Sequence, residues 1–194
     1  MGKVNGIILC GGKSSRMGKD KGLLKFDGKS LMENAISILK PYADQIIICS
    51  NNTNYKQFNY PVIPDIIKDI GPAAGILTGL NYSNTDYNIV ISCDTPFVDA
   101  ALIDHLLLSH KSNFDATIPV HGQHVEPLVG IYSKNFLNSL NKNIKQNILK
   151  MNQILKDSNN IQFVDMKDEL LRNKNLFFNI NTPSDFDCFR MIKN

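Results

Sequence analysis

The sequence has only four cysteines and few arginines, and each of these shortages excludes a class of protein. Three arginines stand among 21 basic residues, against 18 acidic ones, so the chain lacks the dense basic face typical of nucleic-acid binders. Its cysteines form no C-x-x-C pair, which excludes zinc-ribbon and thioredoxin-type motifs. We therefore expect buried, reduced thiols, no nucleic-acid partner, and a small anion as the ligand.

Long hydrophobic runs are also missing. The first apolar run, 7–10, ends at two glycines and is too short for the hydrophobic region of a signal peptide. No later segment approaches a membrane span, so we expect a cytoplasmic protein without membrane contact. A chain of 194 residues with 43% hydrophobic residues can bury one core without disulfides or structural zinc. We expect a single domain, 1–194.

Apolar, β-branched segments alternate with helical patterns in the first 120 residues. Continuous apolar runs predict strands that are buried on both faces. Ser30 and Glu33 form a capping-box pattern ahead of an apolar stripe, which predicts a helix that starts at Ser30. The expected strands are 4–10, 45–50, 60–63, 88–93 and 115–120, and further helices are expected over 72–83 and 98–110. The alternation predicts an α/β fold: a Rossmann-like three-layer α/β/α arrangement with a mostly parallel central sheet.

The second half is less regular, and a final helix is its clearest element. Thr182, Pro183 and Asp185 occupy the N-cap, N1 and N3 positions of that helix. The other expected elements are strands over 126–132, 161–164 and 176–180, and helices over 134–142 and 147–156.

A glycine-rich, basic loop follows the first strand. Such a loop at the carboxyl end of a parallel strand directs backbone N–H groups at phosphate oxygens, and its glycines permit close approach and positive φ. A glycine turn with solvated lysines is the alternative. Ile7 stands where a Walker A loop requires glycine, and no G-x-G-x-x-G exists. The glycines are Gly11, Gly12 and Gly18, and the cations are Lys13, Arg16, Lys19 and Lys21.

Four polar residues follow or flank predicted strands. Asp94 comes directly after 88–93, where a carboxylate can hold Mg²⁺, although a helix-capping role is the alternative. Asp65 can accept two hydrogen bonds from a nucleotide or simply form a turn after a proline. Asn179 and Asn181 would face one side of an extended segment around a core-facing Ile180, unless Asn181 only assists the turn into the last helix.

His121 and His124 have the spacing of metal ligands but lack a third partner, so we expect them to be loop residues near the mouth of the ligand site. The Phe177-Phe178 pair is expected in the core. The chemical role of Glu126-Pro127-Leu128 stays open, with packing as one explanation.

The run L-x-G-G-x-S-x-R-M-G-x-D-K from Leu9 to Lys21 resembles the signature of the molybdenum cofactor guanylyltransferases, which have the nucleotide-diphospho-sugar transferase fold. Further matches follow in order along nearly the whole chain. They are Asp65 with Gly71, Pro72, Ala74 and Gly75; Cys93, Asp94 and Pro96; Glu126, Pro127 and Leu128; and Asn179, Asn181, Thr182 and Pro183.

The resemblance implies an enzyme that transfers GMP from GTP to molybdenum-molybdopterin and releases pyrophosphate, with Mg²⁺ at Asp94. Arg16, Lys21 and Asp94 would be catalytic, and Asn179 and Asn181 would bind the acceptor. The implied nucleotide-binding residues are Leu9, Cys10, Gly11, Gly12, Lys21, Asp65 and Asp94. The resemblance also implies transient contact with cofactor-biosynthesis proteins or recipient molybdoenzymes. The alternatives are a cytidylyl- or sugar-phosphate nucleotidyltransferase and a non-catalytic nucleotide-binding regulator.

Overall fold

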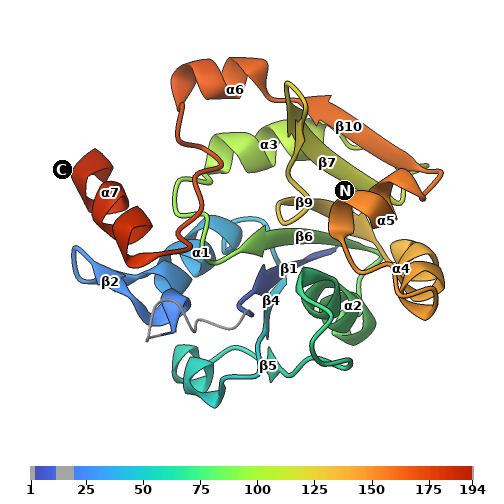
Figure 1. Cartoon of the computed structure of the whole chain (residues 1–194), viewed down its shortest axis with the longest axis horizontal. Coiled ribbons are helices and arrows are strands. Elements are labelled where there is room, and N and C mark those ends of the chain that lie inside the picture. Colours follow the sequence, from blue (N-terminus) through green and yellow to red (C-terminus); the bar gives the residue numbers. More distant parts are fainter. Residues whose placement is uncertain (1–2, 12–19, 194) are drawn as a thin grey trace.

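A central sheet runs through the computed structural model, which describes residues 3–11 and 20–193. Its eight strands have the order β10-β7-β9-β6-β1-β4-β5, with β8 paired to β7 (Figure 1). Strands β8 and β9 are antiparallel to their neighbours, and the other pairs are parallel. The strands are β1 (Val4–Leu9), β4 (Gln45–Cys49), β5 (Val62–Ile63), β6 (Tyr87–Ser92), β7 (Ala116–His121), β8 (His124–Val125), β9 (Gly130–Ser133) and β10 (Ile161–Asp165).

Helices cover both faces of this sheet (Figure 1). One apolar layer holds α1 (Leu31–Leu39) and α3 (Ala100–Ser109), and the other holds α2 (Pro72–Tyr82), α4 (Phe136–Lys145) and α5 (Met151–Lys156). Successive side chains of β1 point into opposite layers: Ile8 packs with the first group of helices and Ile7 with the second. The predicted three-layer α/β/α fold with a mostly parallel sheet is confirmed. No helix in residues 3–11 and 20–193 has the length and hydrophobicity that a membrane crossing needs.

Local signals set where two of these helices begin. Ser30 Oγ accepts a hydrogen bond from Glu33 N (3.2 Å), and Glu33 Oε2 accepts one from Ser30 N (2.7 Å), so the capping box starts α1. Pro72 is the first residue of α2 and follows Gly71, whose φ of +66° favours glycine. Both predicted helix starts are confirmed.

Two glycines let α2 approach the sheet closely. A Cβ added to Gly79 would lie 2.6 Å from Ile7 Cγ2, and one added to Gly75 would lie 3.0 Å from Leu9 Cδ2. The helix axis can therefore lie close to β1, which places the start of α2 beside the carboxyl end of that strand.

Two expected strands differ from the structure, and several elements of the structure were not expected. The segment 176–180 is not a strand. Leu176, Phe177 and Ile180 are buried and Phe178 is half-buried, and they pack against the α3 side of the sheet and against α7 (Pro183–Lys193). Strand β9 is shorter than the expected 126–132 and antiparallel. The unexpected elements are the hairpin β2 (Lys25–Phe26) and β3 (Lys29–Ser30), the 3₁₀ helices η2 (Lys21–Leu23) and η3 (Thr53–Phe58), strand β8, and α6 (Lys167–Arg172). The expectation that His121 and His124 lie in a loop is wrong, because they end β7 and begin β8 and pair with each other across the two strands.

His110 makes the stability of this fold depend on pH. The residue is half-buried at the end of α3, with Nδ1 2.8 Å from Thr117 Oγ1. Burial lowers the pKa of His110 below its ordinary value of about 6.5. The unfolded chain therefore gains a proton at this site at a higher pH than the folded protein. Stability from neutral His110 is present above a pH of about 6.5 and is lost as the pH falls below it.

We expect acidification from about pH 7.5 to about pH 5.5 to lower the urea midpoint of the wild type more than that of His110→Gln. The variant cannot take up the proton, whereas the other titrating groups are common to both proteins. Urea titrations of the two proteins at both pH values test this, and equal decreases would contradict it.

Candidate active site

Three parallel strands, with β1 between the other two, end together at the carboxyl edge of the sheet, which is the side where the parallel strands finish. Strand β1 ends at Leu9, β4 at Cys49 and β6 at Ser92, in matching register. The chain leaves β1 for β4 on one side and later reaches β6 on the other, so this edge is a topological switch point (Figure 1). Open α/β sheets bind ligands at such a crevice.

The residues at the end of β1 are fixed by backbone hydrogen bonds. Cys10 N donates to Cys49 O (2.9 Å), and Leu9 O accepts from Cys93 N (3.1 Å). The side chains of Leu9 and Cys10 are buried, which leaves exposed Gly11 as the first residue open to a ligand. A Cβ added to Gly11 would meet open space, so the backbone at this position is accessible to a ligand. Gly12 and Arg16 lie outside the described residues, as do Lys13, Gly18 and Lys19.

Lys21, Asp94 and Asn181 meet at this edge. Lys21 Nζ donates to Asn181 Oδ1 (2.8 Å) and lies 3.6 Å from Asp94 Oδ2. The Lys21 and Asp94 side chains are 20% and 19% exposed, so both are held by the protein and still reach solvent. A cation and a carboxylate in this arrangement suit a ligand that carries phosphates and a metal ion.

Asp94 is oriented by its neighbours in a way that suits a magnesium ligand. Ser92 Oγ donates to Asp94 Oδ1 (2.5 Å), and Asp94 O accepts from Ile180 N (2.9 Å). Within the described part of the chain, no three His, Cys, Asp or Glu side chains form a cluster able to hold a metal. A single oriented carboxylate fits Mg²⁺, which keeps several waters and takes its other ligands from substrate phosphates.

The start of α7 positions Asn181. Asp185 Oδ2 accepts hydrogen bonds from Asn181 N (2.9 Å) and Thr182 N (2.7 Å), and Thr182 Oγ1 accepts from Asp185 N (3.2 Å). The bond from Asn181 N is the main cause that lowers the pKa of Asp185. Ile180 is fully buried, as predicted. The predicted cap of the last helix is confirmed.

The two asparagines differ in their partners. Asn181 bonds to Lys21, whereas Asn179 Nδ2 donates to Phe177 O (3.1 Å). Each carboxamide has further hydrogen-bonding capacity beyond these bonds, so both can still contact a polar ligand.

Asp65 lies after β5 and pairs with Asn51. Asn51 Nδ2 donates to Asp65 Oδ2 (2.8 Å), and Asp65 N donates to Asn51 Oδ1 (3.1 Å). Partial burial raises the pKa of Asp65, and the hydrogen bond from Asn51 opposes that shift. This pair lies just after β4 and β5, where Asp65 can accept hydrogen bonds from a ligand.

Three of the four cysteines are buried near this edge. A hydrogen bond with Cys10 and then burial raise the pKa of Cys93, and burial raises that of Cys49. Both therefore stay protonated thiols near neutral pH and are poor nucleophiles. Cys188 is exposed, which corrects the expectation that all four are buried.

His121 belongs to a stacked group beside the segment that carries Asn179. Its ring lies parallel to that of Phe177, with centroids 5.1 Å apart, and the His124 ring stacks on it at 5.2 Å. Its Nε2 is 2.9 Å from Glu126 Oε1. Glu126 thus has a hydrogen-bonding partner that its sequence pattern did not indicate. Buried Phe177 is a core residue, as expected, and half-buried Phe178 packs against the apolar cluster that contains Phe97.

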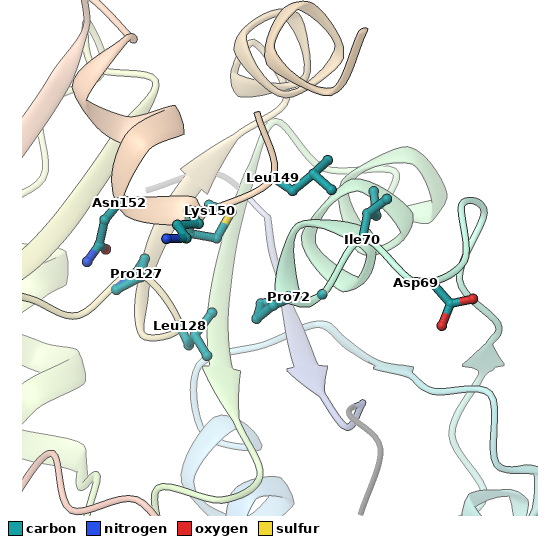
Figure 2. Close-up of a pocket in the computed structure, with 10 residues that line it drawn as sticks. Asp69, Ile70, Pro72, Pro127, Leu128, Leu149, Lys150 and Asn152 are labelled. Atoms are coloured by element: carbon teal, nitrogen blue, oxygen red, sulfur yellow. The ribbon is translucent and has the colours of Figure 1, made fainter. Parts of the chain in front are cut away.

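A pocket of about 530 Å³ opens between α2 and α5 (Figure 2). Pro72 from the start of α2, Leu128 from the loop before β9, and Leu149 and Lys150 before α5 contribute to its wall. The Glu126-Pro127-Leu128 segment therefore supplies part of a concave surface, and Tyr132 Oη donates to Pro127 O (2.6 Å) to hold it. A mostly apolar wall with a few polar groups is typical of a small-molecule pocket.

The site also contains residues that the sequence pattern alone did not single out. Asn51 bonds to Asp65, and Ser92 bonds to Asp94. Asp185 was expected only as a helix-capping residue, yet it also holds the backbone of Asn181. The signal for Ser92 and Asn51 is a polar residue at or just after the end of a predicted strand, the same signal that indicated Asp94.

Comparisons with known proteins identify the family to which the chain belongs. Residues 6–161 match the family model described as the MobA-like NTP transferase domain. The chain is 38% identical over 149 residues to a Flavobacterium johnsoniae protein named "Probable molybdenum cofactor guanylyltransferase", which covers 77% of this chain and 78% of the relative. It is 32% identical over 191 residues to the molybdenum cofactor guanylyltransferase of Vibrio parahaemolyticus, covering 96% of this chain and 95% of the relative.

A solved structure shows the same fold. Molybdopterin-guanine dinucleotide biosynthesis protein A from Archaeoglobus fulgidus has a TM-score of 0.81 and 27% identity, over 97% of this chain and 98% of that one. The resemblance noted in the sequence is therefore confirmed. The chain belongs to the MobA-like NTP transferase family and is a nucleotidyltransferase.

Proposed function

We propose that this protein transfers GMP from GTP to molybdenum-molybdopterin, forming the molybdopterin guanine dinucleotide cofactor and pyrophosphate. The observation that carries the proposal is the meeting of Lys21, Asp94 and Asn181 at the end of β6. The names of the relatives support the choice of GTP and molybdopterin as substrates.

In the proposed reaction, an oxygen of the acceptor's terminal phosphate attacks the α-phosphorus of GTP. The bond from the α-phosphorus to the bridging oxygen breaks, and its electron pair leaves with pyrophosphate. The acceptor phosphate is already anionic near neutral pH, so no general base is required. Catalysis is then positioning and charge stabilisation, and no covalent enzyme intermediate forms.

Each site residue has a defined task in this proposal. Lys21, with Arg16, neutralises triphosphate charge, and Asp94 holds Mg²⁺, which when bound supplies charge neutralisation at the phosphates. Asn179 and Asn181 orient the acceptor. The nucleotide contacts run from the end of β1 to Asp65, through Leu9, Cys10, Gly11 and Gly12.

The remaining parts of the proposal concern the cell. We place the protein in the cytoplasm, where its thiols stay reduced. Because its product is a cofactor, it would make transient contact with cofactor-biosynthesis proteins or with the molybdoenzymes that receive the product.

A thermal-shift panel of GTP, CTP, ATP and UTP, each with and without Mg²⁺, tests the nucleotide half of the proposal without the acceptor. A ligand at 100 times its Kd adds about 2.7 kcal/mol to the stability of the folded state. At about 2–4 °C per kcal/mol, we expect GTP with Mg²⁺ to raise Tm by roughly 5–10 °C. Selective stabilisation by CTP would contradict guanylyl transfer, and no shift with any nucleotide would contradict the nucleotide site itself.

A further inference from the structure

Asp20 directly precedes Lys21 in the chain, and its side-chain carboxylate accepts three hydrogen bonds. Its Oδ1 accepts from Gly22 N (3.1 Å) and from the hydroxyl of Tyr55, and its Oδ2 accepts from Asn52 Nδ2 (2.7 Å). An ionised carboxylate is an acceptor-only group, so this site satisfies three donors at once. The proposed reaction assigns Asp20 no task.

The partners of Asp20 are themselves rigid. Tyr55 is 1% exposed and lies on η3, packed in the core layer that also holds Cys10 and Cys93. Burial, together with nearby thiols and Asp20, raises the pKa of Tyr55, so its hydroxyl keeps the proton that it donates. Asn52 is fixed in turn, because its Oδ1 accepts from Asn54 N (2.9 Å).

The backbone next to Lys21 packs closely against Tyr55, one of the partners of Asp20. A Cβ added to Gly22 would lie 2.3 Å from Tyr55 Oη, so only glycine fits there without displacing the tyrosine. Lys21 is held between two residues in contact with Tyr55, and its flexible side chain extends to Asn181 and Asp94. The position of its ammonium group therefore depends on the position of its backbone.

We propose that Asp20 is a positioning residue for nucleotidyl transfer. Its bonds to Tyr55 and Asn52 place the Lys21 backbone so that the lysine charge meets the nucleotide phosphates beside Asp94. This inference rests on the proposed function, and it adds a requirement for the Asp20 carboxylate, which touches no reacting atom.

Exchanging the carboxylate of Asp20 and the carboxamide of Asn52 tests the inference. In Asp20→Asn the new carboxamide can adopt two orientations. In one its NH₂ group faces the donor Asn52 Nδ2, and in the other it faces Gly22 N–H and the Tyr55 hydroxyl, so at least one hydrogen bond is lost in either case. A shift of about 1 Å in a catalytic group costs roughly 100-fold, so we expect kcat/KM for GTP to fall by about 10- to 100-fold. The KM for GTP should rise while the KM for the acceptor stays unchanged.

The double variant D20N/N52D restores an amide–carboxylate pair with reversed polarity, and an aspartate at position 52 can still accept from Asn54 N. We expect it to recover most of the lost kcat/KM, and to recover the GTP-induced rise in Tm that the single variant loses. Tyr55→Phe should resemble Asp20→Asn. Tyr42→Phe is the matched control, because it removes a tyrosine–aspartate bond of 2.9 Å to Asp104 outside the site, and its kinetics should be those of the wild type.

A folded Asp20→Asn protein with wild-type kcat/KM would overturn the positioning role. So would a lower kcat with both KM values unchanged and a full GTP-induced rise in Tm, because the contact between Lys21 and the triphosphate would then be intact. Failure of D20N/N52D to regain activity or GTP binding would overturn it as well. A wild type that binds GTP but transfers nothing would instead refute the proposed function, and the GTP-induced Tm shifts of the same variants would still decide the role of Asp20.

Discussion

Asp94→Asn is expected to lower Mg²⁺-dependent GMP transfer by roughly a thousand-fold or more, because a bound metal supplies several kcal/mol of charge stabilisation in phosphoryl transfer. The new carboxamide keeps the shape of the side chain and can still accept from Ser92 Oγ, so the fold should survive. What the variant loses is the negative charge that attracts the metal. Steady-state kinetics over a Mg²⁺ titration, with Tm as the measure of folding, test this expectation.

Asp104→Asn is the matched control for that experiment. Asp104 is an exposed carboxylate on α3 that accepts from Tyr42 Oη (2.9 Å), and it lies outside the site. We expect its turnover to equal that of the wild type. Near-normal turnover in Asp94→Asn would reject Asp94 as the metal ligand and would return this residue to a purely structural role.

Lys21→Ala is expected to lower kcat/KM for GTP by about 100- to 1,000-fold, the usual effect of losing one preorganised charge contact to a transition state. Lys21 is the described cation closest to Asp94, and its bond to Asn181 leaves the ammonium with two further protons to donate. Kinetics with GTP varied at saturating acceptor measure the loss.

Lys25→Ala provides the comparison for Lys21→Ala. Lys25 stands four positions later on the exposed strand β2, so its removal changes the net charge of the protein by the same amount. Its kinetics should stay at the wild-type level. If Lys21→Ala behaved like Lys25→Ala, Lys21 would be a solvated charge without a part in the reaction.

The parts of the fold that could be predicted are those with local causes. The capping box at Ser30 and the proline after Gly71 set helix starts through bonds and dihedral angles within a few residues. The β2–β3 hairpin had an equally local signal that the strand pattern overlooked. Asp27 and Gly28 both have positive φ (50° and 78°), and Asp-Gly is the preferred pair for such a two-residue turn.

Other elements could not be predicted because their causes are distant. The segment 176–180 has the apolar residues of a strand, yet it pairs with no strand, and Ile180 is held by one backbone bond to Asp94 O. Hydrophobicity reports that these residues are buried, whereas the choice between a sheet and a loop depends on which backbone groups are within reach. The same ambiguity made β9 look longer than it is.

The sequence by itself determined the α/β alternation, the glycine-rich loop after β1 and the carboxylate after β6, since each of these arises from neighbouring residues. Only the tertiary structure decided which side chains meet. Lys21 and Asn181 are 160 positions apart, and Asp20 and Tyr55 are 35 apart. Such contacts depend on the order of strands in the sheet and on how the last helix packs, and the entropy of closing those long loops is overcome by burial of the shared core.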